Sequence, residues 1–194
     1  GSGTLSWASA SSLTSINTLS DALIEDTGSM YVGNDPSSTT DAANYNLAVG
    51  TTALDAITTG DYNTAIGYNA LTANTEGSYN AAFGYFSLPS NTEGTYNTAF
   101  GMNSLLANLT GHKNTVFGFR AGDVISTGSN NVIVGYNSDP SANTASNQTV
   151  IGYNTTGLAD NSVTLGNANV TAVYMSQDKG ATVYAAALGF GSTA

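Results

Sequence analysis

The chain has 194 residues, of which only 8% are charged, and its 13 acidic residues against three basic ones give a net charge of −10. An acidic surface of this kind repels phosphate backbones, which argues against nucleic acid and anionic membrane as partners. The chain contains no cysteine, which excludes disulfides and thiolate metal sites, and no apolar run approaches the roughly 20 residues of a membrane span.

Residues 1–29 come before the repetitive part of the sequence, and we expect them to form an N-terminal cap or connector. Four apolar residues have the spacing of one face of a short helix: Leu13, Ile16, Leu19 and Leu23. Gly28 is a possible end of that helix. The alternative is an extended stretch wound about the axis of an oligomer.

From residue 30 to residue 166 the sequence repeats itself, as in NTAIGYNAL at 63–71 and NTAFGMNSL at 97–105. One glycine series recurs at a constant interval: Gly33, Gly50, Gly67, Gly84, Gly101, Gly118, Gly135 and Gly152. The final step, to Gly166, is shorter. So short a period leaves no room for helical pairs, and the Ile, Val, Phe, Tyr and Thr of each copy favour strands. The sequence therefore predicts an all-β fold, a parallel β-solenoid (β-roll) with 17-residue coils.

Two further series follow the same period and indicate turns. The glycines at 60, 77, 94, 111 and 128 stand in turn-like segments such as TEGSYN. The asparagines at 46, 63, 80, 97, 114 and 131 predict a stacked amide ladder that closes turn hydrogen bonds inside the coil. We favour these structural roles over ligand or metal binding.

The strand segments are apolar on both faces, which predicts a second buried surface. Apolar residues stand two positions before the glycines from Gly50 to Gly152, alanine in the first four of these coils, as at Ala82 and Ala99, and larger ones stand one position before, as at Phe83 and Phe100. One face fills the coil, and we expect the other to meet further chains in an intertwined or side-by-side homotrimer. We expect the smaller side chains to surround the shared axis and Phe100 to be buried in the stack.

Residues 167–194 lose the period and contain two strand-like runs around the turn SQDKG at 176–180. Solenoids require caps because a terminal coil is an exposed sheet edge. We therefore expect a C-terminal β cap here, with a connection to a following module as the alternative.

The sequence offers little for chemistry, and we predict no catalytic, cofactor-binding or metal-binding residue. His112 occupies a turn position that holds Ser78 and Thr95 in other coils, with no nucleophile tied to it. Glu76 and Glu93 are one period apart and should lie on one edge, where solvated carboxylates are favoured over a weak Ca²⁺ site. Tyrosine ladders at 45–96 and 68–153 are interpreted as packing rather than as a glycan-binding strip.

The repeats resemble two groups of surface proteins. NTAIGYNAL, NTAFGMNSL and especially DNSVTLGNAN at 160–169 are similar to head repeats of trimeric autotransporter adhesins, which are trimers of parallel β-rolls with a period near 14. The same repeats after a segment like LSDALIEDTGSMYVGNDPSS resemble phage tail-fibre and other virion appendage proteins over approximately residues 12–190.

The second resemblance implies a non-catalytic structural fibre segment of a phage virion, located extracellularly and in contact with other fibre proteins at its ends. Contact with a host cell-surface glycan is a further expectation. The alternative is the head module of a bacterial trimeric adhesin. A glycan-degrading spike enzyme is least favoured, because the acidic residues are scattered over loops rather than paired.

Overall fold

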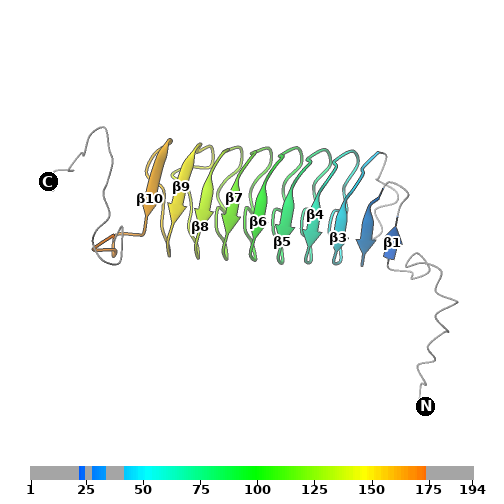
Figure 1. Ribbon diagram of the computed structural model, residues 1–194, viewed down its shortest axis with the longest axis horizontal. Coiled ribbons are helices and arrows are strands. Elements are labelled where there is room, and N and C mark those ends of the chain that lie inside the picture. The colour runs from blue at the N-terminus through cyan, green and yellow to red at the C-terminus, as the bar shows by residue number, and fades with distance from the viewer. Residues whose placement is uncertain (1–21, 25–27, 34–41, 174–194) are drawn as a thin grey trace, which may run out of the picture.

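The repetitive sequence folds into a stack of coils that each contribute one short strand to a single sheet (Figure 1). This computed structural model describes residues 22–24, 28–33 and 42–173. The strands are β1 (Ala22–Ile24), β2 (Met30–Val32), β3 (Leu47–Val49), β4 (Thr64–Ile66), β5 (Ala81–Phe83), β6 (Thr98–Phe100), β7 (Thr115–Phe117), β8 (Val132–Val134), β9 (Gln148–Ile151) and β10 (Ser162–Leu165). The predicted parallel β-solenoid is confirmed.

The register follows directly from the period. From β2 to β10 each strand pairs in parallel with the next. Ala65 lies opposite Ala82, and Ala82 lies opposite Ala99. The last step is shorter, since Val150 pairs with Thr164. Like residues therefore form straight columns along the stack.

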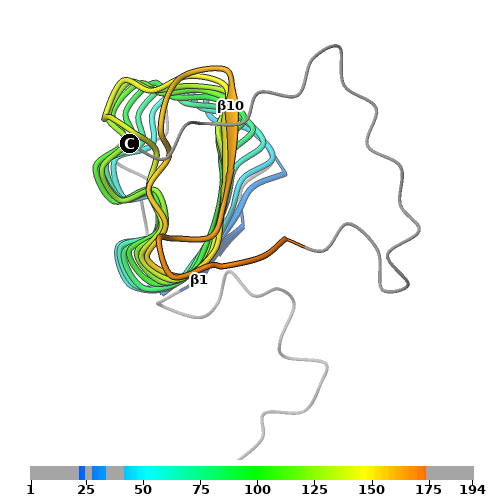
Figure 2. The ribbon, with the colours of Figure 1, turned by 90° about the vertical axis from the view of Figure 1, so that its left-hand side faces the viewer.

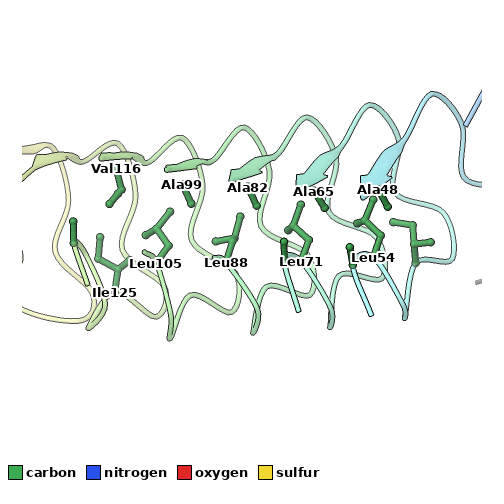
Figure 3. Close-up of a cluster of buried hydrophobic side chains, with 14 of the residues drawn as sticks. Ala48, Leu54, Ala65, Leu71, Ala82, Leu88, Ala99, Leu105, Val116 and Ile125 are labelled. Carbon is green, nitrogen blue, oxygen red and sulfur yellow. The ribbon is translucent and has the colours of Figure 1, made fainter. Parts of the chain in front are cut away.

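The core of the solenoid lies between the sheet and the turns that close each coil. Viewed down the stack, the strands form one wall and the turns the other (Figure 2). Small side chains from the sheet meet larger ones from the turns, as Ala82 and Ala99 do with Leu88 and Leu105 (Figure 3). This alternation of small and large residues fills the narrow interior.

Volume is conserved where the pattern changes. In β7 the small residue becomes Val116, and in the same coil the leucine position becomes Gly122. A Cβ atom added to Gly122 would lie 3.3 Å from a Val116 methyl group and 3.3 Å from Ile125. The larger strand residue thus occupies the space that a leucine fills in other coils.

The expected assignment of the two strand faces is wrong within the described chain. The small residues, Ala99 among them, point into the coil and are fully buried, whereas Phe100 is 51% exposed. The larger side chains therefore lie on the outer face, not in the stack. The interior is too narrow for a phenyl ring at every coil because leucines from the turns already fill it.

The predicted asparagine ladder is confirmed, and it joins the coils through their buried side. Asn80 Nδ2 donates to the carbonyl of Gly94 (2.8 Å), and Asn80 Oδ1 accepts from the amide of Asn97 (3.0 Å). The same pattern runs from Asn46 to Asn131. It starts on Ser29 Oγ and ends at the amide of Gln148. The second glycine series shares the period because its carbonyls accept these bonds.

The first glycine series provides the close backbone approach that the sequence predicts. Gly67 has a φ of 133°, and a Cβ atom there would lie 2.5 Å from the carbonyl oxygen of Gly84 in the next coil. No real Cβ contact is that short. A larger residue would therefore push adjacent coils apart, which explains why glycine recurs at this position.

Non-glycine residues also adopt left-handed conformations in every coil between β3 and β7. Tyr62, Asn69 and Leu71 have φ values of 57°, 57° and 51°, and the equivalent positions of neighbouring coils repeat them. Such conformations carry a cost for residues other than glycine, asparagine and aspartate. They turn the chain back across the core and so decide which strand face is enclosed.

The terminal segments are described only in part. Residues 22–24 of the predicted N-terminal segment form β1, which pairs antiparallel with β2 at the end of the sheet. Leu23 of the predicted helical face lies in this strand; residues 1–21, with the rest of that face, lie outside the described residues. Residues 167–173 contain a turn and no strand, and residues 174–194 of the predicted β cap also lie outside the described part.

Replacing one amide of the ladder tests its contribution to stability. Asn80→Ala leaves the buried amide of Asn97 without its acceptor and removes a donor to Gly94, so we expect a loss of about 2–5 kcal/mol in the free energy of unfolding. Asn143→Ala, at an exposed asparagine in a turn, should change it by less than about 0.5 kcal/mol. Chemical denaturation measures both, and equal effects would show that the ladder is not a main source of stability.

Candidate interaction surface

We call the part of the stack that is formed by the turns, and not by the strands, the turn wall. His112 is exposed there and takes part in a hydrogen-bond ladder between coils. Its Nδ1 accepts from the backbone amide of Thr95 (3.0 Å), and its own amide donates to Ser129 Oγ (3.0 Å). In an earlier coil, Ser78 Oγ accepts from the amide of Asp61 in the same way. The histidine therefore replaces a hydroxyl in a structural role.

Glu76 and Glu93 are both exposed and lie one coil apart on the turn wall. Their backbones lie in register, since the amide of Glu76 donates to the carbonyl of Thr92. Within residues 22–24, 28–33 and 42–173, no three His, Cys, Asp or Glu side chains gather as metal ligands. A weak Ca²⁺ site at the two glutamates, the less favoured alternative in the sequence, has no ligand set in the described chain.

A cluster of two aspartates and one arginine, not predicted from the sequence, lies where the repeat becomes irregular. Arg120 Nε donates to Asp123 Oδ2 (2.7 Å), and the Asp123 side chain is nearly buried. Asp139 Oδ1 is buried with no hydrogen-bond partner. Burial, followed by the charge of Asp123, raises the pKa of Asp139 to about 6, against smaller opposing effects of the Val124 and Asp123 amides and of Arg120. The spacing of Arg120 and Asp123, and the period that places Asp139 level with Gly122, were the signals present in the sequence.

The tyrosine ladders pack on themselves. Tyr79 and Tyr96 stack with ring centroids 4.8 Å apart and planes 3° apart, and Tyr45, Tyr62 and Tyr79 stack at 4.9 Å. A sugar stacks on the face of an aromatic ring, and within the ladder each inner face is covered by the next tyrosine. Desolvation, with the neighbouring tyrosines and Asp61, raises the pKa of Tyr62. The geometry of this ladder agrees with the packing interpretation, and the ladder at 68–153 stacks in two parts on either side of Met102.

The outer face of the sheet is an apolar feature that the coils share. We define the outer column as the last residue of strands β3 to β9: Val49, Ile66, Phe83, Phe100, Phe117, Val134 and Ile151. Phe83 stacks on Phe100 at 5.4 Å, and Phe100 stacks on Phe117 at 5.7 Å. A second column begins one residue past the glycine of each bend, where Tyr68, Tyr85, Met102, Tyr136 and Tyr153 are exposed.

A hollow of about 450 Å³ lies at the end of the stack where the last coil shortens. Its lining comprises Asn154, Thr156, Leu158, Thr164, Gly166, Asn167 and Ala168, with no ionisable side chain among them. Leu158 is 81% exposed because no further described coil covers it. The hollow is thus the open end of the solenoid core and carries no acid, base or nucleophile arrangement for catalysis.

No helix in the described part of the chain is long and apolar enough to cross a membrane. Comparisons of the sequence and the structure with protein-family models, with curated proteins and with solved structures find no significant match. Function must therefore be argued from the surfaces of the stack itself.

The pKa of Asp139 predicts how stability depends on pH. Because the folded-state pKa of about 6 exceeds the unfolded value of about 3.9, the folded state binds the extra proton, and the free energy of unfolding falls as pH rises from about 4 to 6. The full shift corresponds to about 3 kcal/mol, but solvent screens this half-buried carboxyl, so we expect about 1 kcal/mol.

Asp139→Asn should remove that part of the pH dependence and make the protein more stable at pH 7. Thermal or urea unfolding at pH 4, 5, 6 and 7 measures the difference from the unmodified chain. Glu93→Gln, at an exposed carboxyl on the turn wall, is the matched control and should change stability by less than about 0.5 kcal/mol. An Asp139→Asn curve parallel to the unmodified one would contradict the proposed titration.

Proposed function

We propose that this chain is a non-catalytic structural segment of an extracellular fibre, in a phage virion appendage such as a tail fibre, and that it assembles as a homotrimer. The observation that carries the proposal is the unbroken parallel stack from β2 to β10. At about 4.8 Å per coil it forms a rod about 40 Å long. A rod with β1 at one end and β10 at the other (Figure 1) is suited to continue a fibre in both directions.

The use of the buried polar groups supports a structural role. The asparagines at 46–131 use both the oxygen and the nitrogen of the side-chain amide in hydrogen bonds between and within coils. Two of the buried oxygens without a partner are Asn108 Oδ1, at the end of the Asn74–Asn91–Asn108 ladder, and Asp139 Oδ1. Catalytic sites bring together several polar groups with perturbed pKa values in a cleft; the raised pKa of Asp139 comes from its burial beside Asp123.

Contact with a host would involve the turn wall. The turns hold exposed residues such as Glu76, Glu93, His112 and Lys113, and substitutions there leave the core columns unchanged. Binding loops on a rigid scaffold commonly use this arrangement. A surface glycan of the host remains the partner class that we propose for this wall.

The shortened last coil favours a second candidate, the head module of a bacterial trimeric adhesin. The step between β9 and β10 is shorter than all the parallel steps before it, with Gln148 opposite Ser162. This shorter coil has the period of the adhesin heads that DNSVTLGNAN resembles. Saturable adhesion to matrix or glycan, with a membrane anchor encoded in the same gene, would favour this candidate over the fibre.

The homotrimer is tested by its mass. Light scattering on the folded protein at micromolar concentration should give three times the chain mass of 19.6 kDa. A folded protein with the mass of a single chain would refute the trimer.

The location in a virion has its own test. Antibodies against the turn wall should label the fibres of native phage particles in electron micrographs. Labelling of a bacterial cell surface instead would support the adhesin, and release of reducing ends from bacterial surface polysaccharides by the purified protein would refute a non-catalytic role.

A further inference from the structure

We infer that the outer column, Val49 to Ile151, is the surface through which copies of this chain bind one another, side by side, in the same direction and with equal coils at one level. The inference rests on the proposed homotrimer and adds the face, the direction and the register. It also replaces the small-residue contact expected from the sequence, because the small side chains are enclosed in the coil.

Most of the outer column is exposed in the single chain, and only Phe83 and Val134 are half-buried. Phe100 is 51% exposed, Phe117 42% and Ile66 37%. The three phenyl rings stack along the column, which covers their neighbouring faces but leaves their outer sides in water. A continuous apolar surface of this kind is unusual on a chain that stays alone.

Charge is absent from this face. In the described part of the chain, no charged residue stands in the outer column, in the outward column two residues earlier (Leu47, Thr64, Ala81, Thr98, Thr115, Val132 and Thr149) or in the column that contains Tyr68 and Tyr153. The acidic residues of these coils, such as Asp55, Glu76 and Glu93, stand in the turns. Copies that each carry a net charge of −10 can therefore approach through this face with least repulsion.

The size of the face is compatible with an interface. Seven coils at about 4.8 Å give a length of about 34 Å, and the five residues spanned by the three uncharged columns give a width of about 16 Å. The product is about 540 Å² of projected area, near the lower end of the roughly 600–1,000 Å² that each partner contributes to a standard protein interface.

The spacing of the column selects a partner that is itself a β stack. Its rings and branched side chains repeat every coil, at about 4.8 Å, whereas a helix repeats every 5.4 Å and would drift out of step by about 4 Å over six coils. Another copy of this chain has the same pitch. The column has the order Val, Ile, Phe, Phe, Phe, Val, Ile. Side chains of similar size in two copies therefore lie at the same level only when Phe100 of one copy lies level with Phe100 of the other.

Phe100 of one copy can lie level with Phe100 of the other whether the two copies run in the same or in opposite directions. The proposed role in a fibre favours the same direction. When copies run in the same direction, all β1 ends gather at one end of the rod and all β10 ends at the other. Each end then joins one kind of neighbouring segment. Opposed copies would present both kinds of end on each side, which does not extend a fibre.

Single cysteines test the face and the direction because the chain has none of its own. In the Ile66→Cys variant, the introduced cysteines of different chains lie close together at the shared axis. Oxidation or a short bis-maleimide should therefore convert most chains to a covalent dimer on a denaturing gel. The matched control is Thr72→Cys in the same coil, next to Leu71, which points into the core from the wall opposite the sheet (Figure 3); it should remain single. Co-expression of Ile66→Cys and Val134→Cys chains with different mass tags should give no mixed dimer.

The outcomes separate the inference from the proposed function. Cross-linking of Ile66→Cys but not of Thr72→Cys supports it, and a mixed dimer of Ile66→Cys with Val134→Cys overturns the common direction. A trimeric mass without cross-linking of Ile66→Cys overturns the face while the trimer stands. A single-chain mass refutes both. Phe100→Glu should lower the mass to that of one chain with the β circular dichroism retained, and a trimer that persists would also overturn the face.

Discussion

The constraint on which this structure depends is that every coil must satisfy its buried backbone groups through the coils above and below it. A three-residue strand makes few hydrogen bonds of its own, so the asparagine ladder provides the rest. Each amide accepts from the backbone of the next coil and donates to a glycine carbonyl, as Asn63 does to Asn80 and Gly77. Because the same atoms bond along and across the stack, the coil length cannot change without breaking them. The constant period is therefore a hydrogen-bond requirement as much as a packing one.

Close stacking then determines where side chains are allowed. The glycine columns permit backbones of adjacent coils to approach, and the left-handed residues in the turns bring leucines back across the narrow interior. The interior accepts one large and one small side chain per coil, and the exchange of Leu for Gly122 beside Val116 keeps that sum constant. In the coils of β5, β6 and β7 the leucines and Val116 already fill this interior, so the phenyl rings of these strands lie on the outer face, whereas in the first coil the inward residue of β2 is the buried Tyr31.

The outer face is a direct consequence of this narrow core. Its side chains are too large for the interior and too apolar for solvent, while the turns carry most of the charge. A stack built in this way divides its surface into an apolar wall for association and a polar wall for contact with the surroundings. The exposed side chains of the two walls can vary independently, because the asparagine ladder uses the buried asparagines and the backbone carbonyls of the turn glycines and not these side chains.

The sequence by itself determined the architecture of this protein. A constant period, glycines in two phases and a recurring asparagine specify parallel coils of equal length, since like residues must stack in columns. The sequence did not determine which strand face is enclosed. Ala99 and Phe100 are both apolar, and alternation along a strand places them on opposite faces without stating which face the turns will cover. Only the tertiary structure decided this, through left-handed turn residues such as Leu71 and Leu88, because leucine as a residue type does not indicate that conformation. The period alone places Asp139 level with Gly122 of the preceding coil, next to Asp123, where the amide of Gly122 donates to the carbonyl of Ser138. Only the tertiary structure decided that the Asp123 side chain is nearly buried and that Asp139 Oδ1 has no partner, because burial depends on the path of the turns around the two carboxyl groups.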